Sequence, residues 1–382
     1  MDASVVRSVP FFRHSLGPPE LAKVAEALEG PILTTGDLVD DFERQFAAYL
    51  DREYAVGLTS CTAALQLALL ACGIGPGDEV ITTPLTFVAT ANAILQVGAS
   101  PVFVDVEPET GNIKADLIEH AVSRATKAIL PVHLYGQMCD MRAIRGIADR
   151  HGLVVIEDAA HALESKRDGV GPGELSDAAC FSFYATKSIT SGEGGAAVTN
   201  TAEISVQLKK LRSHGMDLIA MDRYRDRYQH WDVDRLGWKY NMDNIQAALL
   251  LPQLEHIEER WHRREEICKR YEVAFSAVPG LDFPKVLPAS KSGRHLFTIW
   301  VSPERRDEVL WMLQERGVGV VVNYRPIHLL SYYRRTFEYG EGMFPVAEEI
   351  GGSTISLPLY PKLTDEEVDY VIDVVSETAA KA

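Results

Sequence analysis

The sequence contains no apolar run long enough to cross a bilayer, and charged residues interrupt its N-terminus where a signal peptide needs an apolar core. We therefore expect a cytoplasmic protein without a membrane-spanning segment. Internal repeats and low-complexity stretches are also missing. With 46% hydrophobic residues, the composition is that of a globular chain and not of a disordered one.

Basic residues are few, since 38 Lys and Arg stand against 54 Asp and Glu, a formal net charge of −16. This balance argues against nucleic acid as a partner, because nucleic-acid binding needs a broad basic face. It still permits a small anionic ligand, since a local group of basic side chains can reverse the field in one cleft. The five cysteines show neither paired nor metal-type spacing, so we expect reduced thiols and no metal site.

The chain of 382 residues is long enough for two α/β domains. Between residues 54 and 200, apolar runs alternate with helical patterns, which predicts a mostly parallel sheet with helices on both faces. Predicted strands are residues 79–83, 101–106, 128–133, 153–157, 178–184 and 196–199, and predicted helices are residues 18–29, 37–50 (capped by Asp37), 86–97 and 141–151.

A long helical pattern over residues 247–277 leads out of this region, and we expect Pro252 to kink it. Beyond it, strands are predicted at residues 295–301 and 318–324, and helices at residues 305–316 and 364–378, the last with a capping box of Thr364 and Glu367. The prediction is a large domain with an N-terminal arm over residues 1–250 and a smaller α/β domain over residues 251–382.

A single lysine, Lys187, interrupts the segment FSFYATKSITSGEGG at residues 181–195. A lone lysine on a turn is usually solvated. Here the turn is a short connection between two apolar strands, where an ammonium loses its water and its pKa falls. Such a lysine is suited to forming a Schiff base with a carbonyl.

Asp158 stands at the carboxyl end of the apolar run LVVIE, at the edge where α/β folds bind ligands. A carboxylate there can pair with the ring nitrogen of pyridoxal phosphate, a cofactor that a Schiff-base lysine serves. Taken alone, Asp158 is equally well explained as the N-cap of a following helix. The presence of Lys187 downstream favours the cofactor role.

A phosphate site is predicted at residues 54–72, where a short strand ends in Ser60 and Thr62 before an Ala/Leu-rich helix. Free N–H groups and the helix dipole suit a phosphate at that position. Either hydroxyl can also cap the helix, and the two roles are compatible. Ser182, at the strand end before Lys187, can add a third hydroxyl.

Four motifs in this order, GLTSCTAAL, PLTFVATANAI, IEDAAHA and FSFYATKSITSGEGG, resemble those of the DegT/DnrJ/EryC1/StrS family of pyridoxal-phosphate-dependent nucleotide-sugar aminotransferases. The resemblance extends from about residue 10 to about residue 375. It implies the aspartate-aminotransferase-like fold type I, with a mostly parallel sheet and a smaller C-terminal α/β domain. It also implies pyridoxal 5'-phosphate as cofactor and a homodimer with shared active sites.

The same resemblance assigns Lys187 as the catalytic residue that holds the cofactor. It places Phe87 against the pyridine ring, although a buried side chain at a helix start is the alternative for this residue. The cofactor contacts that it implies are Ser60, Thr62, Ala63, Phe87, Asp158, His161, Ser182, Lys187 and Asn241.

Substrate contacts are expected from Thr34, Tyr184, Lys239, Arg325 and His328. The loop of Thr34 resembles one that closes over the substrate, although an ordinary interhelical loop explains it equally well. Tyr184 stands where many members have histidine, which leaves the sugar open. Arg325 suits a carboxylate because its fork binds bidentately, whereas His328 is equally well explained as a strand-end histidine bonded to the backbone.

The segment GWKYNMDNIQAAL at residues 237–249 resembles the one that reaches across the dimer to the partner's phosphate. Many members show GYNYRM there, so Lys239 and Asn241 are departures, and which of them meets a phosphate stays open. The nearby Arg223, Arg225 and Arg227 have the pattern of a solvated basic face.

Amino transfer from L-glutamate to a nucleotide-linked 4-keto sugar is the favoured function. Residues 321–337 (VVNYRPIHLLSYYRRTF) and the GWKYNM segment look most like the branch that makes 4-amino-4-deoxy-arabinose and related 4-amino sugars. Amination at carbon 3 is an alternative, because enzymes of both kinds share the large-domain motifs. A sugar 3-dehydratase is disfavoured by Lys187, since histidine is typical there, and a non-catalytic sensor is disfavoured by the intact Asp158, Ser182 and Lys187.

Overall fold

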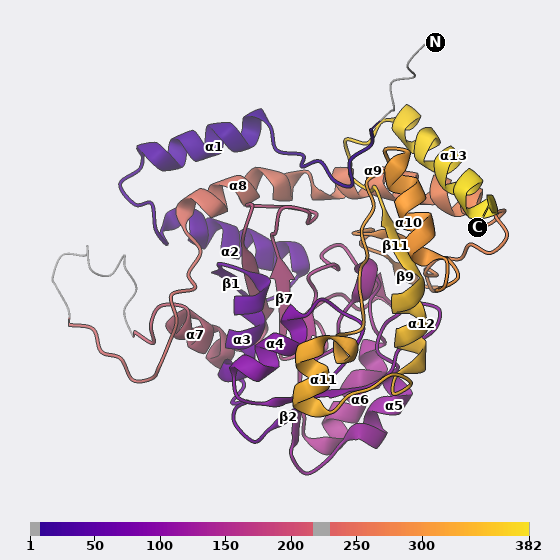
Figure 1. Ribbon diagram of the computed structural model, residues 1–382. Coiled ribbons are helices and arrows are strands. Elements are labelled where there is room, and N and C mark those ends of the chain that lie inside the picture. Colours follow the sequence, from indigo (N-terminus) through magenta and orange to yellow (C-terminus); the bar gives the residue numbers. More distant parts are fainter. Residues whose placement is uncertain (1–7, 217–229, 382) are drawn as a thin grey trace.

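The computed structural model describes residues 8–216 and 230–381, and the basic stretch with Arg223, Arg225 and Arg227 lies outside them. The chain forms a larger lobe around a central sheet and a smaller lobe that contains the C-terminus (Figure 1). In the described ranges, no helix has the length and apolar character needed to cross a bilayer. The same residues contain no cluster of His, Cys, Asp and Glu arranged to hold a metal ion.

A seven-stranded sheet forms the centre of the larger lobe, in the order β1-β8-β7-β5-β4-β2-β3. Its strands are β1 (Tyr54–Leu58), β2 (Glu79–Thr82), β3 (Ser100–Phe103), β4 (Thr126–Ile129), β5 (Val154–Asp158), β7 (Ala178–Ser182) and β8 (Gly195–Thr199). Strand β8 is antiparallel to both of its neighbours, and the other pairs are parallel. Because β1, β5 and β7 consequently point the same way, their carboxyl ends meet at one edge, where such folds bind ligands.

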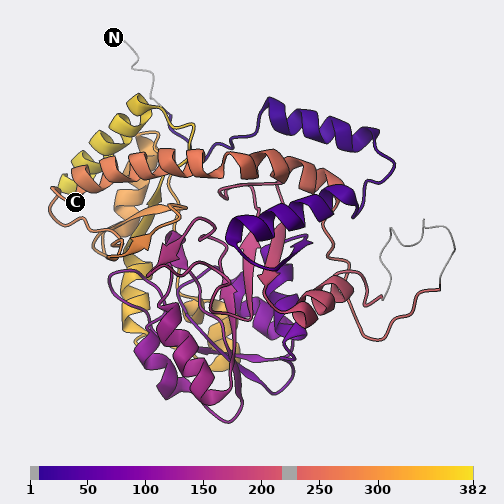
Figure 2. The same cartoon turned by 180° about the vertical axis from the view of Figure 1, so that it is seen from behind.

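Helices cover both faces of this sheet because its strands are apolar on both faces. In β5, Val155 packs in the core beneath α2 (Asp37–Leu50), α5 (Ala115–Ala121), α6 (Met141–His151) and α8 (Asn244–Glu255). The next residue, Ile156, packs on the opposite side with α3 (Cys61–Ala71), α4 (Ala89–Gln96) and α7 (Ala202–Leu211). Helix α1 (Pro18–Glu29) lies alongside α8 in both views (Figures 1 and 2).

The smaller lobe packs three helices around the antiparallel pair β10 (Phe297–Trp300) and β11 (Thr354–Leu357). These helices are α9 (Ile257–Phe275), α10 (Arg306–Glu315) and α13 (Asp365–Lys381). The remaining elements are β6 (Lys166–Arg167), β9 (Ser290–Lys291), α11 (Ser331–Phe337), α12 (Pro345–Ser353) and the 3₁₀ turns η1 (Leu134–Gly136) and η3 (Ile327–Leu329). Val9 of the N-terminal arm belongs to this core and pairs with Val318, which ties the arm to the smaller lobe.

We propose that the domain boundary lies near residue 250. Residues of α8 and the first residue of α9, Ile257, belong to a core of the larger lobe, and residues from Ile267 onward in α9 belong to that of the smaller lobe. In Figure 2, α9 runs from the end of α8 across to the smaller lobe. The division is not complete, because Tyr333 of α11 packs on Phe103 and donates to Asn92 of α4 at 2.6 Å.

Two local predictions were wrong, and a third stays a prediction. The predicted long helix is divided at His256 into α8 and α9, and Pro252 lies inside α8, where the predicted kink is not tested. Residues 318–324 form two isolated bridges and no strand. Asp37 is the first residue of α2, and Gly36 occupies the cap position.

The capping box of α13 is confirmed. The Thr364 N–H donates to Glu367 Oε2 at 3.0 Å, and the Glu367 N–H donates to Thr364 Oγ1 at 3.2 Å. The predicted bounds of α1, α2 and α6 are also those of the structure.

Candidate active site

A pocket of about 650 Å³ opens where the carboxyl ends of β1, β5 and β7 meet. Eight of the predicted site residues line it, namely Ser60, Thr62, Phe87, Asp158, His161, Ser182, Tyr184 and Lys187. Motifs that are far apart in the sequence meet here because each stands at or just after the end of one of four strands that share a direction, β1, β2, β5 and β7.

Asp158 is buried in the wall of the pocket, and its carboxylate accepts hydrogen bonds only from neutral groups. Thr90 Oγ1 donates to its Oδ2 at 2.8 Å, and the N–H of Ala160 donates to its Oδ1 at 3.2 Å. Burial raises the pKa of this carboxyl, because the charged form has lost its water. No helix begins directly after Asp158, because residues 159–177 contain none, so the helix-cap alternative is wrong. A cationic group in the pocket would stabilise the carboxylate.

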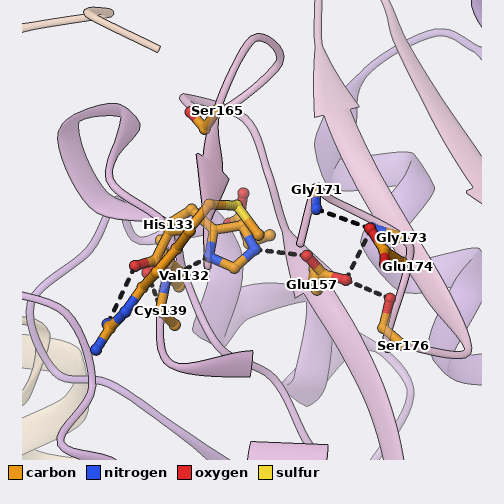
Figure 3. Close-up of polar contacts among 12 residues, drawn as sticks. Val132, His133, Cys139, Glu157, Ser165, Gly171, Gly173, Glu174 and Ser176 are labelled. Atoms are coloured by element: carbon orange, nitrogen blue, oxygen red, sulfur yellow. Dashed lines mark hydrogen bonds and ion pairs between the residues drawn. The ribbon is translucent and has the colours of Figure 1, made fainter. Parts of the chain in front are cut away.

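A network of hydrogen bonds around His133 and Glu157 holds the end of β5 in place (Figure 3). The backbone N–H of Cys139 donates to His133 Nδ1 at 3.1 Å, so this nitrogen carries no proton. The proton on Nε2 is therefore donated to Glu157 Oε2 at 2.6 Å, and Ser176 donates to the other oxygen of Glu157. Since Glu157 directly precedes Asp158, these bonds fix the strand end that carries the pocket carboxylate.

Lys187 lies on the connection between β7 and β8, where its backbone N–H donates to the carbonyl of Tyr184 at 2.9 Å. Burial of its ammonium lowers the pKa of Lys187 to about 8. A larger fraction of the amine is therefore unprotonated near neutral pH than for a solvated lysine. Its Nζ lies 3.3 Å from Nε2 of His295, which comes from the smaller lobe.

The N-terminus of α3 forms another wall of the pocket. Ser60 is the cap residue, and its Oγ accepts the N–H of Ala63 at 3.1 Å. Gly195 of β8 packs directly against this turn, and a Cβ at that position would lie 2.3 Å from the carbonyl carbon of Ser60. The glycine-rich end of the Lys187 segment thus allows β8 to approach the helix N-terminus, which is suited to a phosphate.

Phe87 is 57% exposed and lies before the first residue of α4, so the alternative of a buried helix-start side chain is wrong. Its ring centroid lies 5.8 Å from that of Tyr324. The hydroxyl of Tyr324 is 3.2 Å from Nε2 of His161. Burial lowers the pKa of His161 well below its usual value, so this imidazole is neutral.

The other predicted residues are not among those that line this pocket. Ala63 contributes its backbone to the α3 cap. Thr34, Lys239 and Asn241 form a separate cluster in which Asn241 Nδ2 lies 3.4 Å from Thr34 Oγ1 and Lys239 Nζ donates to Asn241 Oδ1. This cluster adjoins β1, because the N–H of Thr59 donates to the carbonyl of Tyr240 at 2.9 Å.

The structure does not bring Arg325 or His328 to the pocket of its own chain. Arg325 is exposed and does not line the pocket. His328 is fully buried, and its Nε2 lies 3.0 Å from Glu348 Oε1. The alternative prediction for His328 was a hydrogen bond from its ring to the backbone. The structure shows a contact with the Glu348 carboxylate instead.

Sequence reasoning missed several lining residues: Phe11, Glu193, His295, Asn323 and Tyr324. Glu193 could have been predicted from the sequence, because it lies in the glycine-rich end of the Lys187 segment. Phe11 and His295 carry no local signal, since each comes from an element that is distant in the sequence and reaches the pocket only through the packing of the smaller lobe.

The pocket fits pyridoxal phosphate. Buried Asp158 has hydrogen-bond donors but no cationic partner in contact, and a protonated ring nitrogen would supply one. Lys187 supplies the amine, the N-terminus of α3 supplies a phosphate site, and exposed Phe87 supplies an aromatic surface. Fold and pocket together define a pyridoxal-phosphate-dependent aminotransferase of fold type I.

Comparison with known proteins identifies the family. The model of the DegT/DnrJ/EryC1/StrS aminotransferase family matches residues 15–376. The chain is 43% identical over 375 residues to the spore coat polysaccharide biosynthesis protein SpsC of Bacillus subtilis (strain 168), covering 97% of this chain and 96% of that protein. The chain therefore belongs to the DegT/DnrJ/EryC1/StrS aminotransferase family.

Solved structures agree with this assignment. The PMP form of Spr1654, a proposed sugar aminotransferase of Streptococcus pneumoniae, superposes on this chain with a TM-score of 0.93 at 31% sequence identity. The match covers 98% of this chain and 100% of the Spr1654 chain. DesV of S. venezuelae, solved in complex with a ketimine intermediate, gives a TM-score of 0.88 at 37% identity, with 95% of each chain covered. The Spr1654 protein has also been solved in its PLP form.

Proposed function

We propose that this aminotransferase transfers the amino group of L-glutamate to carbon 4 of a nucleotide-linked keto sugar. The observation that carries the proposal is the convergence of Lys187, Asp158 and the α3 N-terminus in one pocket. Sugar aminotransferases among the structural relatives support a sugar as the acceptor. The choice of carbon 4 rests on the resemblance of residues 321–337, of which Val321, Asn323 and Tyr324 line the pocket.

The residues of the pocket divide the chemistry among them. Pyridoxal phosphate, when bound, supplies a carbonyl carbon for the amine and a ring that accepts electrons. With the cofactor bound, the unprotonated amine of Lys187 would remove the proton from the donor's α-carbon and would return it to the carbon that was the cofactor's carbonyl carbon, on the other side of the transferred nitrogen. Asp158 keeps the ring nitrogen protonated, which maintains the ring's capacity to accept electrons. The hydroxyls of Ser60, Thr62 and Ser182 and the N–H groups of α3 bind the phosphate.

The sugar is held at the open side of the pocket. Tyr184 is 47% exposed and Glu193 is exposed, and both line the pocket. A phenol and a carboxylate are suited to sugar hydroxyls, one as donor or acceptor and the other as acceptor. Glutamate and a sugar diphosphate are both anionic, yet Lys187 is the one lysine among the described lining residues and no arginine is present among them.

This shortage of cations supports a homodimer in which each site is completed by the partner. Lys239 and Asn241 lie in the segment that resembles the family's cross-subunit element, and Lys239 is exposed. Large apolar side chains are exposed in the chain segments next to Thr34 and before Lys239: Leu33 is 47%, Trp231 45%, Val233 45% and Leu236 79% exposed. Exposed apolar side chains of this kind are typical of a protein–protein interface.

Mixing two inactive variants tests the shared site. Lys187→Ala protein and Lys239→Ala/Asn241→Ala protein are each expected to have little activity. After subunit exchange, the mixture should regain about a quarter of the wild-type activity, because half of the dimers are hybrids with one intact site each. Analytical ultracentrifugation gives the oligomeric state, and a fully active monomer would reject the proposal.

The regiochemistry is tested by proton NMR of the product. Incubation with L-glutamate and a panel of nucleotide-linked keto hexoses and pentoses is expected to give an amine on carbon 4. A coupling pattern that places the amine on carbon 3 would overturn this choice while leaving amino transfer intact. Loss of oxygen from carbon 3 without amination would instead indicate the 3-dehydratase reaction.

A further inference from the structure

His295 is a buried histidine of the smaller lobe that contacts the lysine of the larger lobe. It is 7% exposed, lies just before β10 and lines the pocket. Its Nε2 is 3.3 Å from Lys187 Nζ, and its ring lies against that of His161, with the centroids 4.3 Å apart. No motif in the sequence singles this residue out, since 108 positions separate it from Lys187.

A buried ion pair braces the chain on both sides of this contact. Arg264 of α9 pairs with Glu164, and their side chains are 4% and 0% exposed. Arg264 Nε donates to the carbonyl of Arg294, the residue before His295, at 3.0 Å. Glu164 Oε2 accepts the hydroxyl proton of Ser188, the residue after Lys187, at 3.2 Å. One pair therefore holds the residue next to each partner of the Nζ···Nε2 contact, through the backbone carbonyl of Arg294 and the side chain of Ser188.

Burial and the nearby Lys187 favour the neutral form of the His295 imidazole. Burial lowers the pKa of His295 well below its usual value, and the charge of Lys187 lowers it further. A neutral imidazole has one ring nitrogen with a free lone pair, which can accept a hydrogen bond. An amine that is detached from the cofactor can donate to that nitrogen.

We propose that His295 is a positioning residue that receives the released amine of Lys187 during turnover and keeps it aimed at the reacting carbon. The inference rests on the amino-transfer chemistry proposed for this pocket. Lys187 is attached to the cofactor in only part of the cycle, and in the remainder its long side chain has many rotamers. A fixed acceptor at 3.3 Å selects one of them, which reduces the entropy lost on reaching the proton-transfer geometry.

Two substitutions separate this role from simple packing. His295→Phe keeps a ring against His161 but has no nitrogen, whereas His295→Gln places an amide oxygen near the position of Nε2 but has no ring. With L-glutamate in single turnover, His295→Phe is expected to lower the rate about ten- to a hundredfold with KM nearly unchanged. The deuterium isotope effect from α-deuterated glutamate should rise, and His295→Gln should retain most of the wild-type rate.

Crystal structures of the three proteins with pyridoxamine phosphate supply a readout besides rate. The Lys187 amine should lie within hydrogen-bonding distance of residue 295 in the wild type and in His295→Gln, and should turn away in His295→Phe. The same substitution at exposed His262, His262→Phe, is the matched control and should change neither readout.

Equal rates for wild type and His295→Phe, or a rate loss that Gln does not restore, would overturn the positioning role. The crystal structures decide it even if a different amino donor replaces L-glutamate. Failure of the wild type with every amino donor would instead reject the proposed function, so the two failures are distinguishable.

Discussion

Lys187→Ala is expected to lower turnover about 10⁴-fold or more, because this lysine both attaches the cofactor and transfers the proton. The chain offers no substitute at the site, since Lys187 is the one lysine among the described lining residues. Borohydride reduction of the wild type should attach the cofactor irreversibly to the peptide that contains Lys187. In the variant, mass spectrometry should find no attached cofactor.

Lys127→Ala is the matched control, because Lys127 is an exposed lysine on β4. It should retain both the labelling and the activity. A borohydride-stable adduct at another lysine of the Lys187→Ala protein would show that Lys187 is not the attachment site.

Asp158→Asn is expected to slow the reaction about a hundredfold or more, equivalent to about 3 kcal/mol of lost electrostatic stabilisation. Asparagine preserves the shape, and its one carbonyl oxygen can replace one of the two acceptors, for example Oδ1 for the N–H of Ala160, while its NH2 group would face Thr90 Oγ1, which can accept. It has no charge to keep the ring nitrogen protonated. The rate of the single-turnover reaction with L-glutamate measures this loss. The absorption spectrum of the bound cofactor should change at the same time.

Asp116→Asn provides the control for this substitution. The Asp116 side chain is 70% exposed, and its Oδ2 lies 3.7 Å from Nζ of Lys114. Near-normal turnover of Asp158→Asn would reject the pairing with the ring nitrogen and leave Asp158 with a structural role in the wall of the pocket.

The sequence was sufficient for the elements with strong local signals. The bounds of α1, α2 and α6 follow from helical periodicity, and the Thr364 capping box follows from the spacing of its two members. Ser60, Asp158 and Lys187 could be predicted to meet because each stands at or after the end of a strand, and parallel strands end at a common edge. Strand β8 runs antiparallel to β7, but this does not move Lys187 away from the common edge. The turn that carries Lys187 begins at the carboxyl end of β7, which lies at that edge.

The contributions of the smaller lobe could not be predicted in this way. Residues 318–324 look like a strand because they are apolar and β-branched, yet only isolated bridges form there. Without a regular strand, the sequence does not fix which side chains face the pocket. Tyr324 reaches it, whereas Arg325 and His328 do not. His295 is placed by the packing of the smaller lobe and by the Arg264–Glu164 pair, both of which depend on long-range contacts.

The most direct test of the account is a two-step single turnover of the purified holoenzyme. Addition of L-glutamate alone should remove the visible absorbance of bound pyridoxal phosphate and release one equivalent of 2-oxoglutarate per site. Addition of a nucleotide-linked 4-keto sugar should then restore the absorbance and yield one equivalent of amino sugar. If the absorbance is unchanged by every amino donor while Lys187 holds the cofactor, the protein does not transfer amino groups and the account is contradicted.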